Sequence, residues 1–244
     1  MPISSGTLPA SVVKLTAVEA KLLAREPGSF FAVVIPLFIL VIFGFSLTPG
    51  DAVLLPTTLA IGVGLVGLYL VPTTLATYRE RGILRRLAAT PLRPEALLAV
   101  QLLLQLGLAV LGCGLLPVAV GALLGAAVPR PGLVPWAVAV FLLGAVAMFA
   151  IGLVIAAVAA NGRSANGIGV LLYFPLAYLA GLMQPRHLMP EALAQAGEFT
   201  PLGAFVRSLR DLWAGDAPHP VHLGIMAAYA ALAGLAAAKS FRWE

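Results

Sequence analysis

Residues 131–162, PGLVPWAVAVFLLGAVAMFAIGLVIAAVAANG, form a run of 32 residues that contains no charged side chain. An α-helix needs about 20 mostly apolar residues to cross the hydrocarbon core of a bilayer. The chain as a whole is 61% hydrophobic and 10% charged, whereas soluble domains carry about 25% charged residues. The sequence therefore predicts an integral membrane protein. Five further uncharged runs are long enough to span: 27–50, 52–78, 96–129, 164–185 and 217–238.

We predict an all-α membrane protein with six transmembrane helices. The apolar runs are continuous, and barrel strands would instead show alternating segments of roughly ten residues. A helix also satisfies every backbone polar group within its own segment, which lipid cannot do. Residues 1–29 are predicted as a cytoplasmic N-terminal segment and 30–244 as one transmembrane domain. The expected spans are about 30–47, 56–77, 98–120, 134–159, 168–183 and 221–238.

The basic residues indicate the orientation. Six spans place both termini on one side of the membrane. Eleven of the 15 Lys and Arg then share that side, in the N-terminal segment, the 78–96 loop, the 161–167 loop and the C-terminal tail. Because basic loops stay cytoplasmic, we expect both termini to lie inside a bacterial cell membrane.

A third of the positive charge lies in the stretch YRERGILRRLAATPLRPEAL, residues 78–97. Arg81 and Arg85 would share one face of a helix, which Pro91 would end near Thr90. Apolar residues at helical spacing would form a second face: Ile83, Leu84, Leu87 and Ala88. The pattern predicts a short amphipathic helix between spans 2 and 3. Such a helix suits a groove on a cytoplasmic partner or an anionic lipid surface, although the arginines could also serve only to set topology.

The stretch ERGILRRLAATPLRPEALLAVQLL, residues 80–103, resembles the signature of type-2 ABC transporter permeases, which export drugs and polysaccharides. In that family a Glu-Arg-Gly run precedes a helix with leucines and arginines, a Thr-Pro turn and the third span. The resemblance implies that this segment is the coupling helix, which docks on a separate ATP-hydrolysing subunit. The docking residues it implies are Glu80, Arg81, Gly82, Leu84, Arg85, Arg86, Leu87, Thr90 and Pro91.

Residues 179–215, between spans 5 and 6, are similar to the external segment of the same family. Pro190 is expected to begin one short helix, and Thr200 and Pro201 to begin another that ends before Gly215. The resemblance implies a re-entrant hairpin that closes the outer end of the pathway, and a plain amphipathic loop is the alternative. Ala180 departs from the family pattern, in which a serine precedes the glycine. The implied gate residues are Pro185, Pro190, Pro201, Phe205 and Arg210.

Residues 11–25 are predicted to form an amphipathic helix at the cytoplasmic surface. Lys14, Lys21 and Arg25 fall within about 40° of one another on a helical wheel. Apolar residues of the adjoining face would enter the leaflet: Leu15, Val18 and Leu22. The segment is similar to the elbow helix of the same family, and an ordinary flanking segment is the alternative.

The polar residues exclude several functions. A phosphate loop needs a glycine-rich run followed by lysine and serine or threonine, and the three lysines, at 14, 21 and 239, have no such context. No charged residue falls within a predicted span, which argues against an ion-coupled carrier. His187, His219 and His222 lack further ligands at convincing spacing, so no metal site is predicted. We expect no catalytic residue and no cofactor on this chain, with ATP and Mg²⁺ bound by a partner ATPase.

Small residues and prolines occur inside the predicted spans. The glycines indicate close helix packing: Gly62, Gly64, Gly67, Gly144 and Gly152. The prolines each remove a backbone donor: Pro36, Pro72, Pro117 and Pro175.

These patterns predict the membrane subunit of an ATP-driven exporter, paired with a second, identical or related permease subunit. The cargo is expected to be amphipathic, such as a drug, a lipid or a lipid-linked glycan. If the cargo is a drug, the exporter would act in drug efflux and antibiotic resistance. Nucleic acid is not an expected partner. Two alternatives remain: a haem-export-type permease of cytochrome maturation, and a membrane scaffold or enzyme that transports nothing. The candidate cargo contacts are Tyr69, Tyr173 and Tyr178.

Overall fold

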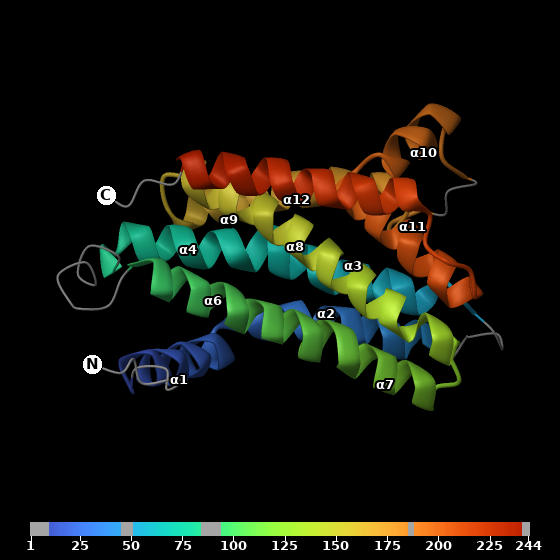
Figure 1. The fold of residues 1–244 in the computed structure, drawn as a ribbon, viewed down its shortest axis with the longest axis horizontal. Coiled ribbons are helices and arrows are strands. Elements are labelled where there is room, and N and C mark those ends of the chain that lie inside the picture. The colour runs from blue at the N-terminus through green and yellow to red at the C-terminus, as the bar shows by residue number, and fades with distance from the viewer. Residues whose placement is uncertain (1–9, 45–50, 84–93, 185–187, 241–244) are drawn as a thin grey trace, which may run out of the picture.

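The computed structural model describes residues 10–44, 51–83, 94–184 and 188–240. Within these ranges every regular element is a helix, as Figure 1 shows. Five helices are long and apolar enough to cross a membrane: Pro27–Gly44, Leu54–Glu80, Leu97–Leu123, Pro131–Val158 and Pro220–Ser240. The all-α membrane fold that the composition predicted is therefore confirmed.

The second and third of these helices are each continuous across several segments. The second consists of α3 (Leu54–Leu65), the π-helical η1 (Val66–Leu70) and α4 (Val71–Glu80). The third consists of α6 (Pro94–Leu108), the π-helical η2 (Ala109–Leu115) and α7 (Leu116–Leu123). The remaining elements are α1 (Ala10–Arg25), α2 (Pro27–Gly44), η3 (Pro131–Leu133), α8 (Val134–Val158), α9 (Gly162–Leu179), α10 (Glu191–Glu198), α11 (Pro201–Ala214) and α12 (Pro220–Ser240).

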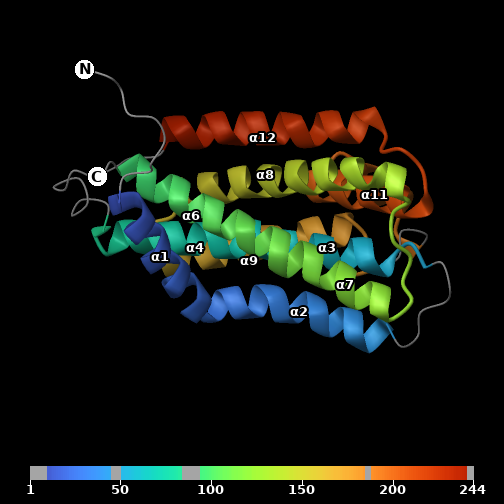
Figure 2. The ribbon, with the colours of Figure 1, turned by 60° about the horizontal axis from the view of Figure 1, so that its bottom comes forward.

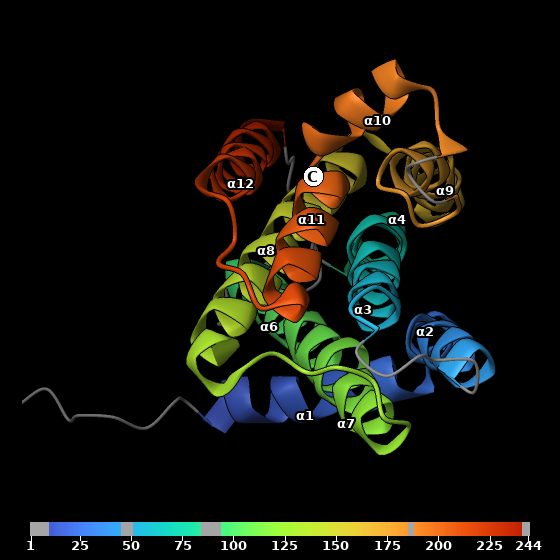
Figure 3. The same cartoon turned by 90° about the vertical axis from the view of Figure 1, so that its right-hand side faces the viewer.

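The long helices run lengthwise and side by side, whereas α1 lies across them. In Figure 2 the helices α2, α6–α7, α8 and α12 follow the long axis of the molecule. Figure 3 looks along that axis, so α2, α3–α4 and α9 are seen end-on and α1 is seen from its side. In α1, Val18 is 56% and Leu22 51% exposed, while Glu19 and Leu23 are buried against the bundle. The exposed pair leaves an apolar edge available to the membrane surface.

The predicted fifth span corresponds to α9, with different ends. The helix begins at Gly162 because the Asn161 side chain caps it, accepting a hydrogen bond from Ser164 N at 2.8 Å. Most of the predicted 161–167 loop is therefore helical, and that prediction was wrong. The helix ends at Leu179, before Gly181 turns the chain with φ of 72°. Arg163 and Asn166 in its first turns make α9 less apolar than the other five helices, so the count of six spans stays a prediction.

Pro27 also differs from expectation. The sequence predicted that the first span begins at about residue 30, but α2 begins at Pro27, and only Glu26 separates it from α1. Proline suits a first helical position because its missing N–H would have no partner there. The chain therefore turns sharply from α1 into α2 at a single residue.

The second span forms the centre of the bundle. Large residues along it are fully buried: Leu55, Leu59, Val63, Val66 and Leu70 are all at most 2% exposed. By contrast α12 buries few residues and packs mainly on α8 and α11. Large exposed side chains such as Leu232 and Leu235 face outward from α12. Such a surface suits lipid, because acyl chains replace the protein neighbours that a soluble core would need.

Glycines bring backbones into direct contact around the second span. A methyl group added at Gly152 of α8 would collide with the Gly67 carbonyl, and one at Gly169 of α9 would collide with the Leu68 carbonyl. Gly144 similarly accommodates the ring of Phe205 from α11. Lipid gives no hydrophobic drive for helices to associate, so close van der Waals packing through small residues holds them together. The close packing predicted for the span glycines is confirmed at Gly144 and Gly152; Gly169 was not among the predicted positions.

Two of the span prolines follow a π-helical segment. Pro72 comes two residues after η1, and Pro117 two residues after η2. Proline lacks an N–H and its ring crowds the carbonyl four residues earlier. A wider π turn just before it accommodates both effects without ending the helix. Pro36 and Pro175 instead lie inside α2 and α9.

Replacement of Gly152 by alanine is expected to destabilise the fold. The added methyl must push α8 away from the Gly67 carbonyl, and overpacking of this kind costs about 1–3 kcal/mol. Gly107→Ala is the matched control, since nothing lies within 4 Å of a methyl group there. Alanine should stabilise that helix by up to about 1 kcal/mol. Thermal unfolding in detergent should thus separate the two variants, and equal midpoints would contradict the packing.

Candidate functional site

The end of α4 leads directly into the predicted coupling segment. Of the nine predicted docking residues, the structure describes Glu80, Arg81 and Gly82; the others, Leu84, Arg85, Arg86, Leu87, Thr90 and Pro91, lie outside the described residues. Arg81 is exposed and donates its backbone N–H to Thr77 O at 3.0 Å. Gly82 has φ of 63°, a left-handed conformation that glycine adopts without strain. The Glu-Arg-Gly run therefore ends α4 and redirects the chain.

Arg79 joins this end of α4 to α8. Its guanidinium donates to Ala156 O at 2.9 Å, to Ala157 O at 3.1 Å and also to Ala159 O. The last carbonyls of a helix have no partner within the helix, and a cation is favoured at that end of the helix dipole. Arg79 thus caps α8. Sequence reasoning counted Arg79 only as one of the topology charges.

Glu80 joins α4 to α9. Its carboxylate accepts a hydrogen bond from Gly162 N, the first residue of α9, at 3.1 Å. An acidic group is stabilised at a helix N-terminus by the unpaired N–H groups there. A side chain at Gly162 would collide with the Thr77 hydroxyl, so α9 reaches α4 only because this residue is glycine. The predicted docking residue Glu80 therefore has a structural role of its own.

Two further contacts join α4 to the N-terminal helices. The Tyr78 hydroxyl donates to Glu19 of α1 at 2.6 Å, and the Thr74 hydroxyl approaches the Glu26 carboxylate at 3.4 Å. Burial raises the pKa of the Glu26 carboxyl, and the contact with Thr74 opposes that shift. We call Thr74, Tyr78, Arg79 and Glu80 the α4 junction. It connects the entrance of the predicted coupling segment to α1, the α1–α2 turn, α8 and α9.

A cleft of about 300 Å³ lies between α2, the second span and α9. It brings together Tyr69 and Tyr173, two of the three predicted cargo contacts, whereas Tyr178 is not part of its wall. None of the described residues that line it is charged: Gly28, Phe31, Ala32, Ile35, Leu65, Tyr69, Val170, Tyr173 and Phe174. Gly28 is the second residue of α2, so the cleft begins at the end of the bundle that carries the α4 junction. Its walls suit an apolar or amphipathic molecule.

The segment between α9 and α12 enters the bundle. Thr200 caps α11 by accepting from Gly203 N at 3.0 Å, and Gly215 ends it in a left-handed conformation. Phe205 is 0% exposed, and its ring centroid lies 6.2 Å from that of Phe141 in α8. Pro190 precedes α10 as its N-cap and Pro201 begins α11, while Pro185 lies outside the described residues.

Two polar side chains of α11 lie among neighbouring helices rather than in water. Ser208 is 0% exposed, and Arg210 is half-buried and donates to Thr57 Oγ1 and Gly181 O, each at 3.2 Å. A helix on the membrane surface would leave both side chains in water. They are covered because α3, α8, α9 and α12 surround α11. Arg210 ties α11 to the start of the second span and to the turn after α9.

Metal ligands do not gather in the part of the chain that the structure describes: no group of three or more His, Cys, Asp or Glu could hold an ion there. The His219 and His222 rings lie 5.7 Å apart, and His187 falls outside the described residues.

The comparison with known protein families yields one match. The family model described as "ABC-2 type transporter" matches residues 11–212. This range contains the α4 junction, the cleft and nearly all of α11. No curated protein matches the chain.

Removal of the Arg79 guanidinium is expected to destabilise the bundle. Arg79→Ala leaves the last carbonyls of α8 without this donor, which should lower the free energy of unfolding by about 1–3 kcal/mol. The matched control is Arg207→Ala. Its partner Asp211 lies one helical turn further along α11 at 3.6 Å, and the two side chains are 48% and 23% exposed. Such pairs contribute at most about 0.5 kcal/mol. Unfolding of the two variants in detergent measures the difference, and similar losses would show that Arg79 does not cap α8.

Proposed function

Because the chain belongs to the ABC-2 type transporter family, we propose that it is the membrane-spanning subunit of an ATP-driven exporter. In this proposal ATP and Mg²⁺ bind to a separate ATPase subunit. A second permease subunit, identical or related, completes the pathway. The cargo is an amphipathic molecule, such as a drug, a lipid or a lipid-linked glycan, that leaves the cytoplasm or the inner leaflet. The observation that carries the proposal is the α4 junction.

The α4 junction supports a route for mechanical coupling. A shift of the segment after Gly82 would displace α4, and α4 is bonded to α8 through Arg79 and to α9 through Glu80. An ATPase can bias the permease only if it contacts the two conformations differently. In this proposal Leu84 and Leu87 anchor the ATPase through apolar contact. Arg81, Arg85 and Arg86 orient it through acidic residues or lipid phosphates.

The cleft supports an amphipathic cargo. Its walls combine apolar side chains with the hydroxyl groups of Tyr69 and Tyr173. Phe31 and Phe174 on its rim are 54% and 51% exposed, so a second permease subunit or lipid would face them. Cargo would enter from the leaflet on the α4 junction side. We propose that this side is cytoplasmic, as the basic residues predict, in a bacterial cell membrane with six spans and both termini inside.

At the other end of the bundle, α10 and α11 would form the outer gate. Arg210 would keep it shut through Thr57 and Gly181. Outward release of cargo would require α11 to move relative to α3 and α9, which would break these two hydrogen bonds.

A double change of Leu84 and Leu87 to aspartate is expected to abolish ATPase binding without preventing membrane insertion. Two carboxylates in an apolar interface cost several kcal/mol, so association should fall more than about 100-fold. The measurement is purification in mild detergent with quantification of any copurifying ATPase. Arg163→Asp is the control, because it changes the net charge by the same two units at an exposed residue in the first turn of α9.

Normal ATPase recovery with the double variant would remove the proposed docking surface. If the unaltered chain bound no ATPase even after crosslinking, the exporter proposal itself would fail, and a scaffold or enzyme function would be favoured.

Blocking the cleft is expected to reduce cargo-dependent ATP hydrolysis. Val170→Trp fills the cleft, and overpacking costs about 1–3 kcal/mol, which corresponds to a loss of about tenfold in apparent affinity. Leu171→Trp is the matched control, since Leu171 is 76% exposed and lies outside the cleft wall. The measurement is ATPase stimulation of the reconstituted complex by a panel of lipophilic cations and single-chain amphiphiles. Equal loss in both variants would place the pathway elsewhere.

A further inference from the structure

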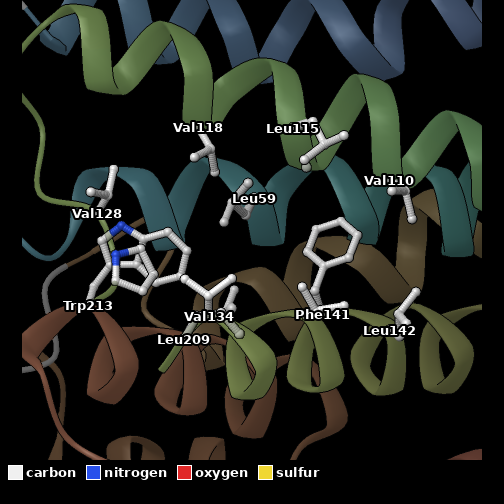
Figure 4. A pocket seen from close by; sticks show the side chains of 14 residues that line it. Leu59, Val110, Leu115, Val118, Val128, Val134, Phe141, Leu142, Leu209 and Trp213 are labelled. Carbon is white, nitrogen blue, oxygen red and sulfur yellow. The ribbon is translucent and has the colours of Figure 1, made fainter. Parts of the chain in front are cut away.

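A second cavity, of about 410 Å³, lies between α3, the third span, α8 and α11. None of the described residues that line it also lines the cleft between α2 and α9. Figure 4 shows Val110, Leu115 and Val118 of the third span facing Val134, Phe141 and Leu142 of α8 across the cavity, with Leu59 behind them. Trp213 of α11 closes one end beside Val128. The proposed transport route uses no part of this cavity.

The cavity is apolar and opens on the outer surface of the bundle. Leu59, Phe141 and Leu209 form a buried floor. At the mouth, Leu115 is 60% and Val138 is 53% exposed. These residues belong to helices long and apolar enough to cross the membrane, so the mouth opens on hydrocarbon. An apolar cavity does not hold water, and an acyl chain is the apolar group that membrane lipid presents there.

The Trp213 end of the cavity carries an unsatisfied donor. Trp213 is only 7% exposed, and its indole N–H has no acceptor among the described residues. A buried donor without a partner costs about 1–3 kcal/mol, whereas the remaining wall is entirely apolar. A ligand with one carbonyl above an apolar chain would satisfy this N–H. Tryptophan is also typical of the boundary between hydrocarbon and headgroups.

A cation lies just beyond this end. Arg130 is exposed, follows the lining residue Pro129, and its guanidinium lies against Gly215 near the end of α11. Asp216 is next in sequence, yet no ion pair within 4.0 Å joins Arg130 to a carboxylate in the described part of the chain. Arginine matches the geometry of phosphate oxygens. From the end of the bundle inward, the chain thus presents the cation of Arg130, then the hydrogen-bond donor of Trp213, then the apolar cavity.

We propose that this cavity binds a glycerophospholipid of the leaflet opposite the α4 junction. One acyl chain fills the cavity, its ester carbonyl accepts from Trp213 Nε1, and its phosphate binds Arg130. Val134 and Leu142 are eight residues apart on α8, so the cavity wall runs for about 12 Å along the helix axis. A cavity of this length can hold the part of one acyl chain that lies nearest the headgroup. The lipid would hold Leu209 and Trp213 of α11 against α8 and the third span, which makes lipid composition a regulator of α11.

The test uses a protein in which Trp213 is the only tryptophan, made by Trp136→Phe and Trp243→Phe. It is reconstituted in phosphatidylcholine vesicles that contain a minor fraction of phosphatidylglycerol with brominated acyl chains. Bromine quenches indole fluorescence on contact, so a chain in the cavity should quench Trp213 although the ring is buried. Ala137→Leu fills the cavity and should abolish this quenching. Ala139→Leu, an exposed neighbour outside the cavity wall, should leave it unchanged.

The headgroup part of the proposal has its own measurement. Arg130→Gln should raise the amount of brominated phosphatidylglycerol needed for half-maximal quenching by about tenfold. It should have no effect on quenching by brominated diacylglycerol, which has no phosphate. In native mass spectrometry of the otherwise unaltered chain, Trp213→Phe should reduce retained phospholipid by about fivefold. The Arg207→Gln control should retain its phospholipid. Neither the quenching measurement on Arg130→Gln nor the mass spectrometry of Trp213→Phe depends on the folding of the Ala137→Leu variant.

Equal quenching in the Ala137→Leu and Ala139→Leu proteins would overturn the proposal, since bulk lipid would then account for the signal. An absence of quenching together with disulfide-linked dimers of Val138→Cys would also overturn it, because a second copy of the chain would cover the mouth.

Discussion

The architecture depends on the backbone contact of the second span with its two neighbours. The Gly67 and Leu68 carbonyls lie against Gly152 of α8 and Gly169 of α9, where any side chain would collide with them. Water is absent from the hydrocarbon, so apolar surface alone does not drive helices together there. Van der Waals attraction between closely packed backbones holds the helices together instead. These two contacts place α8 and α9 around a buried second span, and the α4 junction, the cleft and the Arg210 contacts lie along its length.

The second span also connects those regions. At one end the α4 junction bonds it to α1, α8 and α9. Near its middle, Gly64 accommodates the ring of Tyr173 from the cleft and lies close to Leu202 at the start of α11. At the far end Thr57 accepts from Arg210. One helix therefore touches the entrance of the proposed coupling segment, the proposed cargo cleft and the proposed outer gate. A displacement at Glu80 need not pass through any flexible loop to reach the other two.

Three arginine and glutamate side chains make the polar contacts between helices that matter most for this arrangement, and their partners lie at or just beyond helix ends. Arg79 and Glu80 satisfy carbonyl and N–H groups that α8 and α9 cannot satisfy themselves, and Arg210 does the same for the carbonyl of Gly181. Between these ends most of the buried side chains are apolar, and the two cavities lie toward opposite ends of the bundle. That separation lets one lie on the proposed route of cargo while the other holds lipid against α11. The π-helical segments η1 and η2 contribute Tyr69 to the first cavity and Val110 to the second.

The sequence by itself determined the membrane fold, the approximate positions of the long helices and the family signature, because each is a local property. Hydrocarbon tolerates only uncharged helical runs, Thr200 and Gly215 mark the ends of α11 through their own conformations, and the Glu-Arg-Gly run is contiguous. It misplaced the start of α9 because an uncharged run does not reveal that a helix extends past Arg163 to a cap at Asn161. Arg79 gave no local signal either, since its acceptors lie 77 to 80 positions away. Only the tertiary structure decided which arginine caps a helix, which tyrosines share a cleft and where Arg130 lies against the end of α11, because these depend on distances between segments that composition and spacing do not encode.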